Sequence, residues 1–222
     1  MERIKAWVKT GKIKTAAGVF LLLGILGFFG QEEAWGQGFA RCDALNQKGQ
    51  YREALACYEP LAEQGDAVAQ SNLGVMYQYG QGVPQDYVKA VYWYQKSADQ
   101  GNAGGQSNLG LMYANGYGVP QDYGKAVYWL QKAAEQGNPD GQSNLGIMYL
   151  GGKGVSQDYG KAVYWFQKSA EQGHAPGEFN LGLLYQYGEG VPQDDGKAVY
   201  WFQKAADQGF EPAIQKLHTM GR

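Results

Sequence analysis

The hexapeptide NLGVMY at residues 72–77 has three further copies along the chain: NLGLMY at 108–113, NLGIMY at 144–149 and NLGLLY at 180–185. A second pattern alternates with the first, as KAVYWYQKSA at 89–98, KAVYWLQKAA at 125–134, KAVYWFQKSA at 161–170 and KAVYWFQKAA at 197–206. Both patterns recur every 36 residues without a gap. A period between about 20 and 50 residues is typical of an array whose units bury their apolar faces against their neighbours.

Each unit predicts two helices. In the first unit, apolar residues at helical spacing predict a helix from about residue 67 to 79, which ends at the glycines of the loop 80–82. The second helix is expected to start after Asp86, whose carboxylate can accept free amide donors, and to stop at Gly101. Its expected buried stripe consists of Ala90, Trp93, Tyr94, Ser97 and Ala98.

These motifs resemble the Sel-1-like repeat family, a relative of the tetratricopeptide repeat. The resemblance rests on residues 72–77, on the loop GQGVPQDY at 80–87 and on residues 89–98. It implies an all-α fold, a right-handed α-solenoid of antiparallel helix pairs. Four full copies are expected at 66–101, 102–137, 138–173 and 174–209. The departures are small: Ser156 replaces the loop proline, Asp195 the loop tyrosine and Phe179 a serine.

The segments that flank the four copies are expected to cap the solenoid. Residues 37–65 resemble a degenerate helix pair, and residues 210–222 predict a short closing helix. Cys42 and Cys57 lie on either side of a turn near Gly49, so an antiparallel pair would bring them together. A disulfide is the hypothesis, and two free buried thiols are the alternative.

Residues 1–36 predict a secretory signal peptide. Five basic residues precede a run without charge from Ala16 to Gly30, and polar residues lead to a cleavage site after about Gly36. A retained membrane anchor is the alternative, although fifteen residues is short for a spanning helix, which needs roughly 20. Cleavage predicts a periplasmic or secreted protein with no stable membrane insertion.

Composition excludes several classes of protein. The 34 Gly against 7 Pro exclude collagen, and the 17 Tyr and 6 Trp argue against disorder. Cleavage after Gly36 would leave 14 Lys and Arg against 18 Asp and Glu, a net charge of −4. Such a chain lacks the basic surface that binding to a phosphate backbone requires, so nucleic acid is not expected as a partner.

No constellation of reactive side chains is recognisable, so no enzyme activity, metal or cofactor is expected. His174 and His218 are far apart, and neither has an evident partner to orient it. One Asp per unit precedes each second helix and is interpreted as an N-cap that forms a weak surface pair with the Lys three residues later. These residues are Asp86, Asp122, Asp158 and Asp194.

Some secreted, cysteine-containing members of the family are β-lactamase-like or penicillin-binding, which gives an alternative function of a different class. This chain contains no Ser-x-x-Lys and no Ser-Asp-Asn. Its one Lys-Thr-Gly, at residues 9–11, lies inside the expected signal peptide.

Helical repeat arrays present a concave surface lined by their first helices, and a monomer that binds a protein or peptide there is the main hypothesis. The positions that vary between copies on that side are interpreted as the groove. They are Ser71, Val75, Gln78, Tyr79, Ser107, Leu111, Asn115, Ser143, Ile147, Leu150, Phe179, Leu183, Gln186 and Tyr187. Free drift of solvated positions is the alternative. A column of tyrosines (Tyr92, Tyr128, Tyr164 and Tyr200) is expected to pack in part against the neighbouring unit, and an exposed ridge is the alternative.

Overall fold

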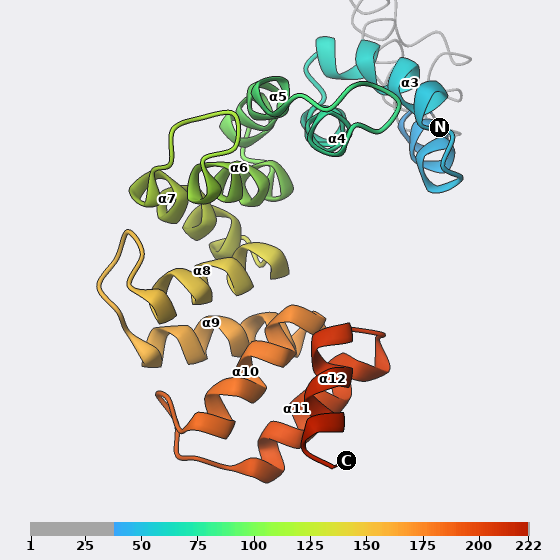
Figure 1. Cartoon of the computed structure of the whole chain (residues 1–222). Helices are drawn as coiled ribbons and strands as arrows, with labels where there is room; N and C mark the ends of the chain where they lie inside the picture. Colours follow the sequence, from blue (N-terminus) through green and yellow to red (C-terminus); the bar gives the residue numbers. More distant parts are fainter. Residues whose placement is uncertain (1–37, 222) are drawn as a thin grey trace, which may run out of the picture.

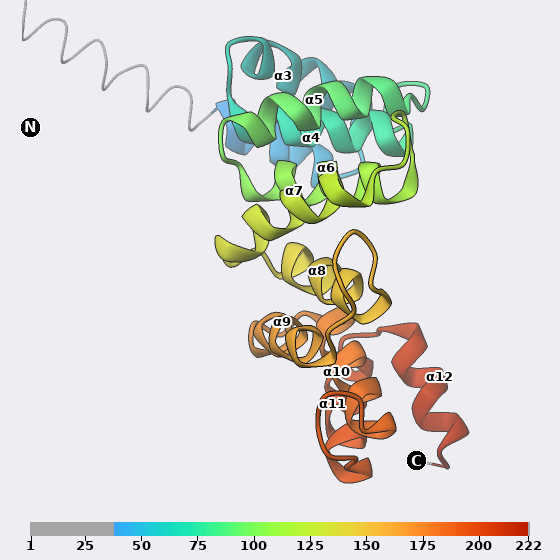
Figure 2. The same cartoon turned by 90° about the vertical axis from the view of Figure 1, so that its left-hand side faces the viewer.

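The computed structural model describes residues 38–221, and this part of the chain consists of helices and turns without strands (Figure 1). A helix over residues 38–47 packs beside α3 (Tyr51–Glu63), and α12 (Glu211–Thr219) closes the array. Four pairs lie between them: α4 (Ala67–Tyr79) and α5 (Tyr87–Asp99), α6 (Ala103–Asn115) and α7 (Tyr123–Glu135), α8 (Pro139–Gly151) and α9 (Tyr159–Glu171), and α10 (Ala175–Tyr187) and α11 (Asp195–Asp207). The pairs stack into an open arc with the two ends of the described chain at opposite ends of the stack (Figures 1 and 2). This is the α-solenoid predicted from the repeats.

The expected signal peptide and its alternative, the membrane anchor, lie outside the described residues. Within residues 38–221, no helix is long and apolar enough to cross a bilayer.

The helix boundaries follow from caps that recur in every unit. Each first helix ends at a glycine in the left-handed conformation, with φ between 62° and 72°, where other residues would be strained: Gly80, Gly116, Gly152 and Gly188. Each second helix begins at the predicted Asp N-cap; the Asp86 carboxylate, for example, accepts the Lys89 amide hydrogen at 3.0 Å. The lysines form exposed pairs with these carboxylates at 3.5–3.9 Å, which confirms the predicted weak surface pairs.

Each hydrophobic core cluster includes residues of two consecutive units. Ala90, Tyr94 and Ala98 of α5 form one buried cluster with Leu109 and Met112 of α6, the first helix of the following unit. The same arrangement joins α3 to α4, α7 to α8, α9 to α10 and α11 to α12. Each of these clusters therefore depends on two consecutive units.

The tryptophans lie at the edges of these clusters, so Trp93, which was expected in the buried stripe, is only half-buried. Tyr94 is completely buried, whereas Trp93 is half-buried and contacts the cluster between α3 and α4. Trp129, Trp165 and Trp201 cover the next three clusters in the same way. The reason is that Ala90, Tyr94 and Ala98, four residues apart, define the buried stripe and leave Trp93 at its edge.

Glycine inside each first helix allows the second helix to approach closely. A Cβ added at Gly110 would lie 2.7 Å from Cγ of Leu130 and 3.2 Å from the Ala126 carbonyl oxygen. The second loop glycine of each unit has a similar role between units. A Cβ at Gly82 would lie 2.7 Å from the Tyr51 carbonyl group, so this loop rests on the start of the second helix of the preceding pair.

The expected disulfide is present. It joins Cys42, which is completely buried in the helix 38–47, to Cys57 in α3, with 5.3 Å between the Cα atoms. Among the described residues there is no free cysteine, so the alternative of two free thiols is wrong. The covalent link closes the first helix pair, which has a shorter connecting turn than the later pairs.

The close approach at Gly110 gives a first prediction. Gly110→Ala should lower the free energy of unfolding by about 1–3 kcal/mol, because the added methyl group overpacks the contact with Leu130. Gly160→Ala is the matched control, since Val88 occupies the equivalent position of α5 and the nearest atom to a Cβ at Gly160 is 3.4 Å away. The control should be neutral or stabilise by up to about 1 kcal/mol through helix propensity. Urea titration followed by circular dichroism measures both, and equal midpoints would contradict the packing role of Gly110.

The disulfide gives a second prediction. The double replacement Cys42→Ala and Cys57→Ala should destabilise the first helix pair by roughly 3 kcal/mol, the loop-entropy value for a loop of about 15 residues. Because repeat arrays unfold locally, hydrogen exchange should accelerate in residues 38–63 and remain unchanged in α9 and α11. Uniform acceleration along the whole array would show that the bond supports more than its own pair.

Candidate functional site

The inner face of the arc is formed by the first helices. α4 contacts α6, α6 contacts α8, and α8 contacts α10. Within residues 38–221, no comparable contact joins successive second helices, which lie on the outer side (Figures 1 and 2). The first helices therefore line the concave face, and the expected groove residues all lie on them.

Three of the expected groove residues are inaccessible to a partner. Ser71, Ser107 and Ser143 are only 8%, 2% and 2% exposed. Their column lies where successive first helices meet, because a Cβ added at Gly104 of α6 would be 3.7 Å from the Ser71 hydroxyl oxygen. The expectation that these serines line the groove is wrong, since small side chains are needed at this helix contact.

Phe179 occupies the same column in the fourth unit and is also committed to packing. Its ring centroid lies 5.5 Å from that of Phe202 and 5.6 Å from that of Phe210. It belongs to the half-buried edge of the last core cluster. It is therefore a packing residue rather than a free groove side chain.

One branched aliphatic residue per unit follows the tightly packed glycine. We call this set the aliphatic ladder; it consists of Val75, Leu111, Ile147 and Leu183. Ile147 is 38% exposed and the other three are half-buried. Val75 and Leu183 pack against neighbouring core clusters. The ladder is thus a row of partly accessible apolar side chains held in place by the core.

Neutral polar and aromatic groups lie one turn further along the first helices. Tyr79 and Tyr187 are 64% and 62% exposed, and Asn115 is also exposed. Gln78 is half-buried, and its side-chain oxygen accepts a hydrogen bond of 2.6 Å from the Tyr94 hydroxyl group.

Two other expected groove residues, Leu150 and Gln186, are half-buried, and the Gln186 amide donates to the sulfur of Met220 at 3.8 Å. Burial raises the pKa of Tyr94 above its ordinary value, so this hydroxyl group stays protonated as a donor to Gln78. The accessible part of the expected groove therefore consists of the ladder, the exposed tyrosines and side-chain amides.

The tyrosines of the column on the second helices are about half exposed, and each packs in part against the tryptophan of its own helix. The exposed fractions are 51% for Tyr92, 52% for Tyr128 and Tyr164, and 55% for Tyr200. Each ring meets the edge of the adjacent tryptophan at 4.9–5.0 Å between centroids. A lysine four residues later lies over the ring, as for Lys96, 4.8 Å from the Tyr92 centroid.

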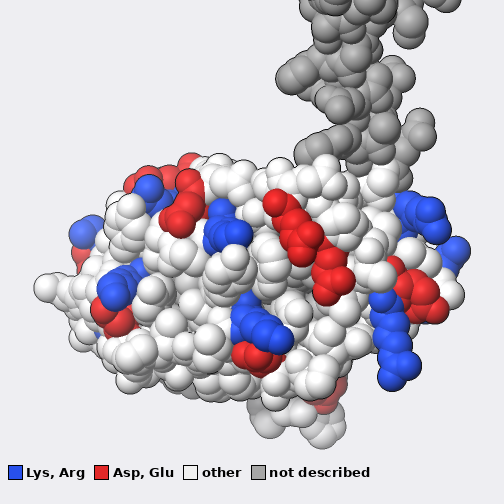
Figure 3. All heavy atoms as spheres, turned by 90° about the horizontal axis from the view of Figure 1, so that it is seen from above, with Lys and Arg blue, Asp and Glu red and all other residues white. Residues whose placement is uncertain are grey.

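On the face of the molecule seen from above, charged side chains of both signs are interspersed (Figure 3). In the space-filling view from above, lysines and arginines lie beside aspartates and glutamates, with no extended area of one sign (Figure 3). Within residues 38–221, no group of three or more His, Cys, Asp and Glu side chains is placed to hold a metal ion.

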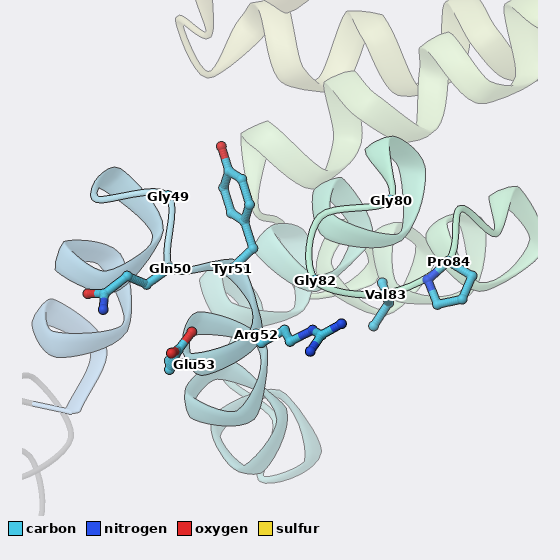
Figure 4. Close-up of a pocket in the computed structure, with 9 residues that line it drawn as sticks. All are labelled: Gly49, Gln50, Tyr51, Arg52, Glu53, Gly80, Gly82, Val83 and Pro84. Carbon is cyan, nitrogen blue, oxygen red and sulfur yellow. The ribbon is translucent and has the colours of Figure 1, made fainter.

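A pocket of about 660 Å³, which was not predicted from the sequence, lies beside the first helix pair (Figure 4). The turn at residues 48–50 and the first turn of α3 form one side of it, and the loop from Gly80 to Pro84 forms the other. In the later pairs, a longer loop such as 80–86 connects the two helices. The pocket therefore occupies the space left by the shorter turn that connects the first two helices. Its two charged lining residues, Arg52 and Glu53, have opposite signs.

His174 has partners that the sequence reading missed. Its Nε2 atom donates to the Asp140 carboxylate at 2.9 Å, and its Nδ1 atom lies 2.8 Å from the Ser169 hydroxyl oxygen. Asp140 and His174 are 34 residues apart, and a separation close to one repeat period places residues of adjacent units side by side. The interpretation of His174 as a histidine without a partner is therefore wrong.

The hydrogen-bonded chain of Ser169, His174 and Asp140 connects two units and has a structural role. Ser169 is completely buried, and its hydroxyl group donates to the Pro139 carbonyl group at 2.8 Å. A nucleophilic serine must reach a substrate carbonyl with its proton held by the histidine. The three side chains instead hold the junction between the third and fourth units.

The pairing has a pH-dependent consequence. The hydrogen bond from His174 lowers the pKa of the Asp140 carboxyl group below 3.8. A lowered folded-state pKa stabilises the protein above the unfolded-state value and loses this effect as the pH falls through the folded-state value.

Asp140→Asn should therefore lower the melting temperature near neutral pH, and the difference from wild type should disappear well below pH 3.8. Thermal melts across this range measure the effect. Asp195→Asn, at an exposed residue in the first turn of α11, is the control and should behave like wild type. A difference for Asp140→Asn that does not depend on pH would contradict the ionic contribution.

Comparison with known proteins agrees with this architecture. The family model described as Sel1 repeat matches residues 45–66, 67–102, 103–138, 139–174 and 175–210. The shorter first match falls on the disulfide-linked pair. No curated protein matches the chain.

Solved structures share the fold. A Sel1 repeat protein from Oxalobacter formigenes is 34% identical with a TM-score of 0.70, over 75% of this chain and 66% of that chain. The protective antigen c5321 of uropathogenic Escherichia coli, which displays an SLR fold, is 42% identical with a TM-score of 0.67, over 75% of this chain and 36% of that chain. The immunity protein Pa5087 from Pseudomonas aeruginosa is 26% identical with a TM-score of 0.56, over 78% and 68% of the two chains. The aligned region thus spans 66% and 36% of the lengths of the first two proteins. With five matches that span residues 45–210, this chain belongs to the Sel1 repeat family.

Proposed function

We propose that this protein is an exported, non-catalytic scaffold that binds a protein or peptide segment on its concave face. Sel1 and related tetratricopeptide-like repeat proteins generally mediate protein–protein interactions. The finer assignment, to the concave face, is supported by the aliphatic ladder and the exposed tyrosines beside it. The ladder carries the proposal, because it places one partly accessible apolar side chain of each unit on the same face, and exposed apolar surface marks interaction sites.

Support for export comes from the disulfide. Structural disulfides persist in oxidising compartments such as the periplasm or the exterior of the cell. The bond between Cys42 and Cys57 closes the first helix pair and is consistent with such a compartment. The charge-free run from Ala16 to Gly30 is the second argument, from sequence.

The alternative class, a β-lactamase-like or penicillin-binding protein, needs an accessible nucleophile. Ser169 is the serine that contacts His174, and it is completely buried. No observation on the described residues therefore favours this alternative over the scaffold.

The ladder gives the test of the proposed function. Ile147→Asp should abolish capture of a stoichiometric protein partner from cell-envelope extract, because a carboxylate on the ladder would have to be desolvated against apolar groups. Leu111→Asp should have the same effect. Val88→Asp is the matched control: Val88 is an aliphatic residue of a second helix, is 66% exposed, and should leave capture unchanged.

Capture is read by quantitative mass spectrometry, and helicity by circular dichroism. Loss of binding in both Ile147→Asp and Val88→Asp would exclude a specific role for the concave face. Retention of binding in both ladder variants would place the binding surface elsewhere.

A further inference from the structure

Charged residues are sorted between the two kinds of helix. α4 and α6 contain no Lys, Arg, Asp or Glu, and α8 and α10 contain one acidic residue each, Asp140 and Glu178. The second helices α5, α7, α9 and α11 each carry at least two lysines and one acidic residue. The concave face is therefore built from helices that are almost free of charge.

The two acidic residues on the first helices are already engaged. Asp140 accepts the hydrogen bond from His174. Glu178 is completely buried; it accepts a hydrogen bond of 2.8 Å from the Gln208 amide and lies 3.5 Å from the Lys204 ammonium group. Both carboxylates are therefore paired, although the Asp140 side chain, in the first turn of α8, is 65% exposed.

The groups that remain on this face are neutral. They are the aliphatic ladder, the phenols of Tyr79 and Tyr187, and the side-chain amides of Gln78, Asn115 and Gln186. Toward the C-terminal end, the ammonium group of Lys216 in α12 lies 5.5 Å from the Tyr187 ring centroid. The neutral face thus spans four units and is bounded at that end by a lysine.

We propose that the segment bound on the concave face is uncharged and rich in aliphatic or aromatic side chains. This inference rests on the proposed function and names the chemistry of its partner. A charged segment would lose its hydration on this face without meeting an opposite charge, which is unfavourable. A neutral segment places apolar side chains on the ladder, and its backbone amides find hydrogen-bond partners in the phenols and amides.

The test uses a random library of short phage-displayed peptides, selected on the purified full-length chain. Only peptides that bind wild type and fail to bind the Ile147→Asp variant are retained. We expect these peptides to be depleted in Asp, Glu, Lys and Arg relative to the unselected library. Their Kd should change less than about twofold between roughly 0.05 M and 0.5 M NaCl, because salt screens only charge–charge interactions.

Asn115→Asp is the second variant, because it adds one charge to an exposed side chain at almost constant volume. It removes the hydrogen bond of 3.0 Å from the Asn115 amide to the Leu111 carbonyl group, so circular dichroism must show unchanged helicity. It should weaken binding of the selected neutral peptides at least about fivefold, whereas Val88→Asp should not weaken it. Enrichment of peptides of one charge sign, or a tenfold loss of affinity with salt, would overturn the neutral-partner inference and leave the concave site intact. The absence of any peptide that depends on Ile147 would overturn both proposals. Sedimentation that reveals a dimer, dissociated by Ile147→Asp, would instead identify a second copy of this chain as the occupant.

Discussion

The sharing of every core cluster between two consecutive units is the constraint on which the rest of the structure depends. A second helix supplies an alanine, a large apolar residue and a second small residue, and the next first helix supplies the leucine and methionine or leucine that complete the cluster. A single helix pair would expose this apolar surface, and each large side chain left in water forgoes about 1.5–3 kcal/mol. The shared core clusters therefore hold the units in register. The tryptophans cover the junctions between consecutive units.

This constraint separates residues that are fixed from residues that can vary. The Leu73 column, the helix glycines and the cap carboxylates hold each unit in the array and are the same, or nearly the same, in all four copies. The aliphatic ladder keeps its apolar character but changes its shape from Val to Leu to Ile. Positions such as Tyr79 and Asn115, which touch no core cluster, differ most. The core contacts fix the position of this face, whereas its accessible side chains can differ from unit to unit. Such a face suits recognition of another chain.

The sequence was sufficient for the fold and for much of the local chemistry, because the signals repeat. The 36-residue period, the Asp N-caps, the left-handed cap glycines and the disulfide all follow from residue type and spacing. The errors concern side chains whose environment depends on neighbouring units. The serines at 71, 107 and 143 have the spacing of groove residues, but they lie at contacts between first helices. His174 pairs with a residue 34 positions away, and Gly82 rests on Tyr51 of the preceding pair. Spacing within one unit carries no information on such contacts, although the same period, applied between units, would have placed Asp140 beside His174.

The sharing of core clusters also bears on how such a chain can change its length. Since every junction between the four copies joins the same columns, removal or duplication of a 36-residue stretch within residues 66–209 recreates a junction of the existing kind. A gene that recombines between its own copies therefore lengthens or shortens the protein by whole helix pairs, and no new kind of core contact is needed. Unequal crossing-over can therefore change the length of the concave face by one unit at a time.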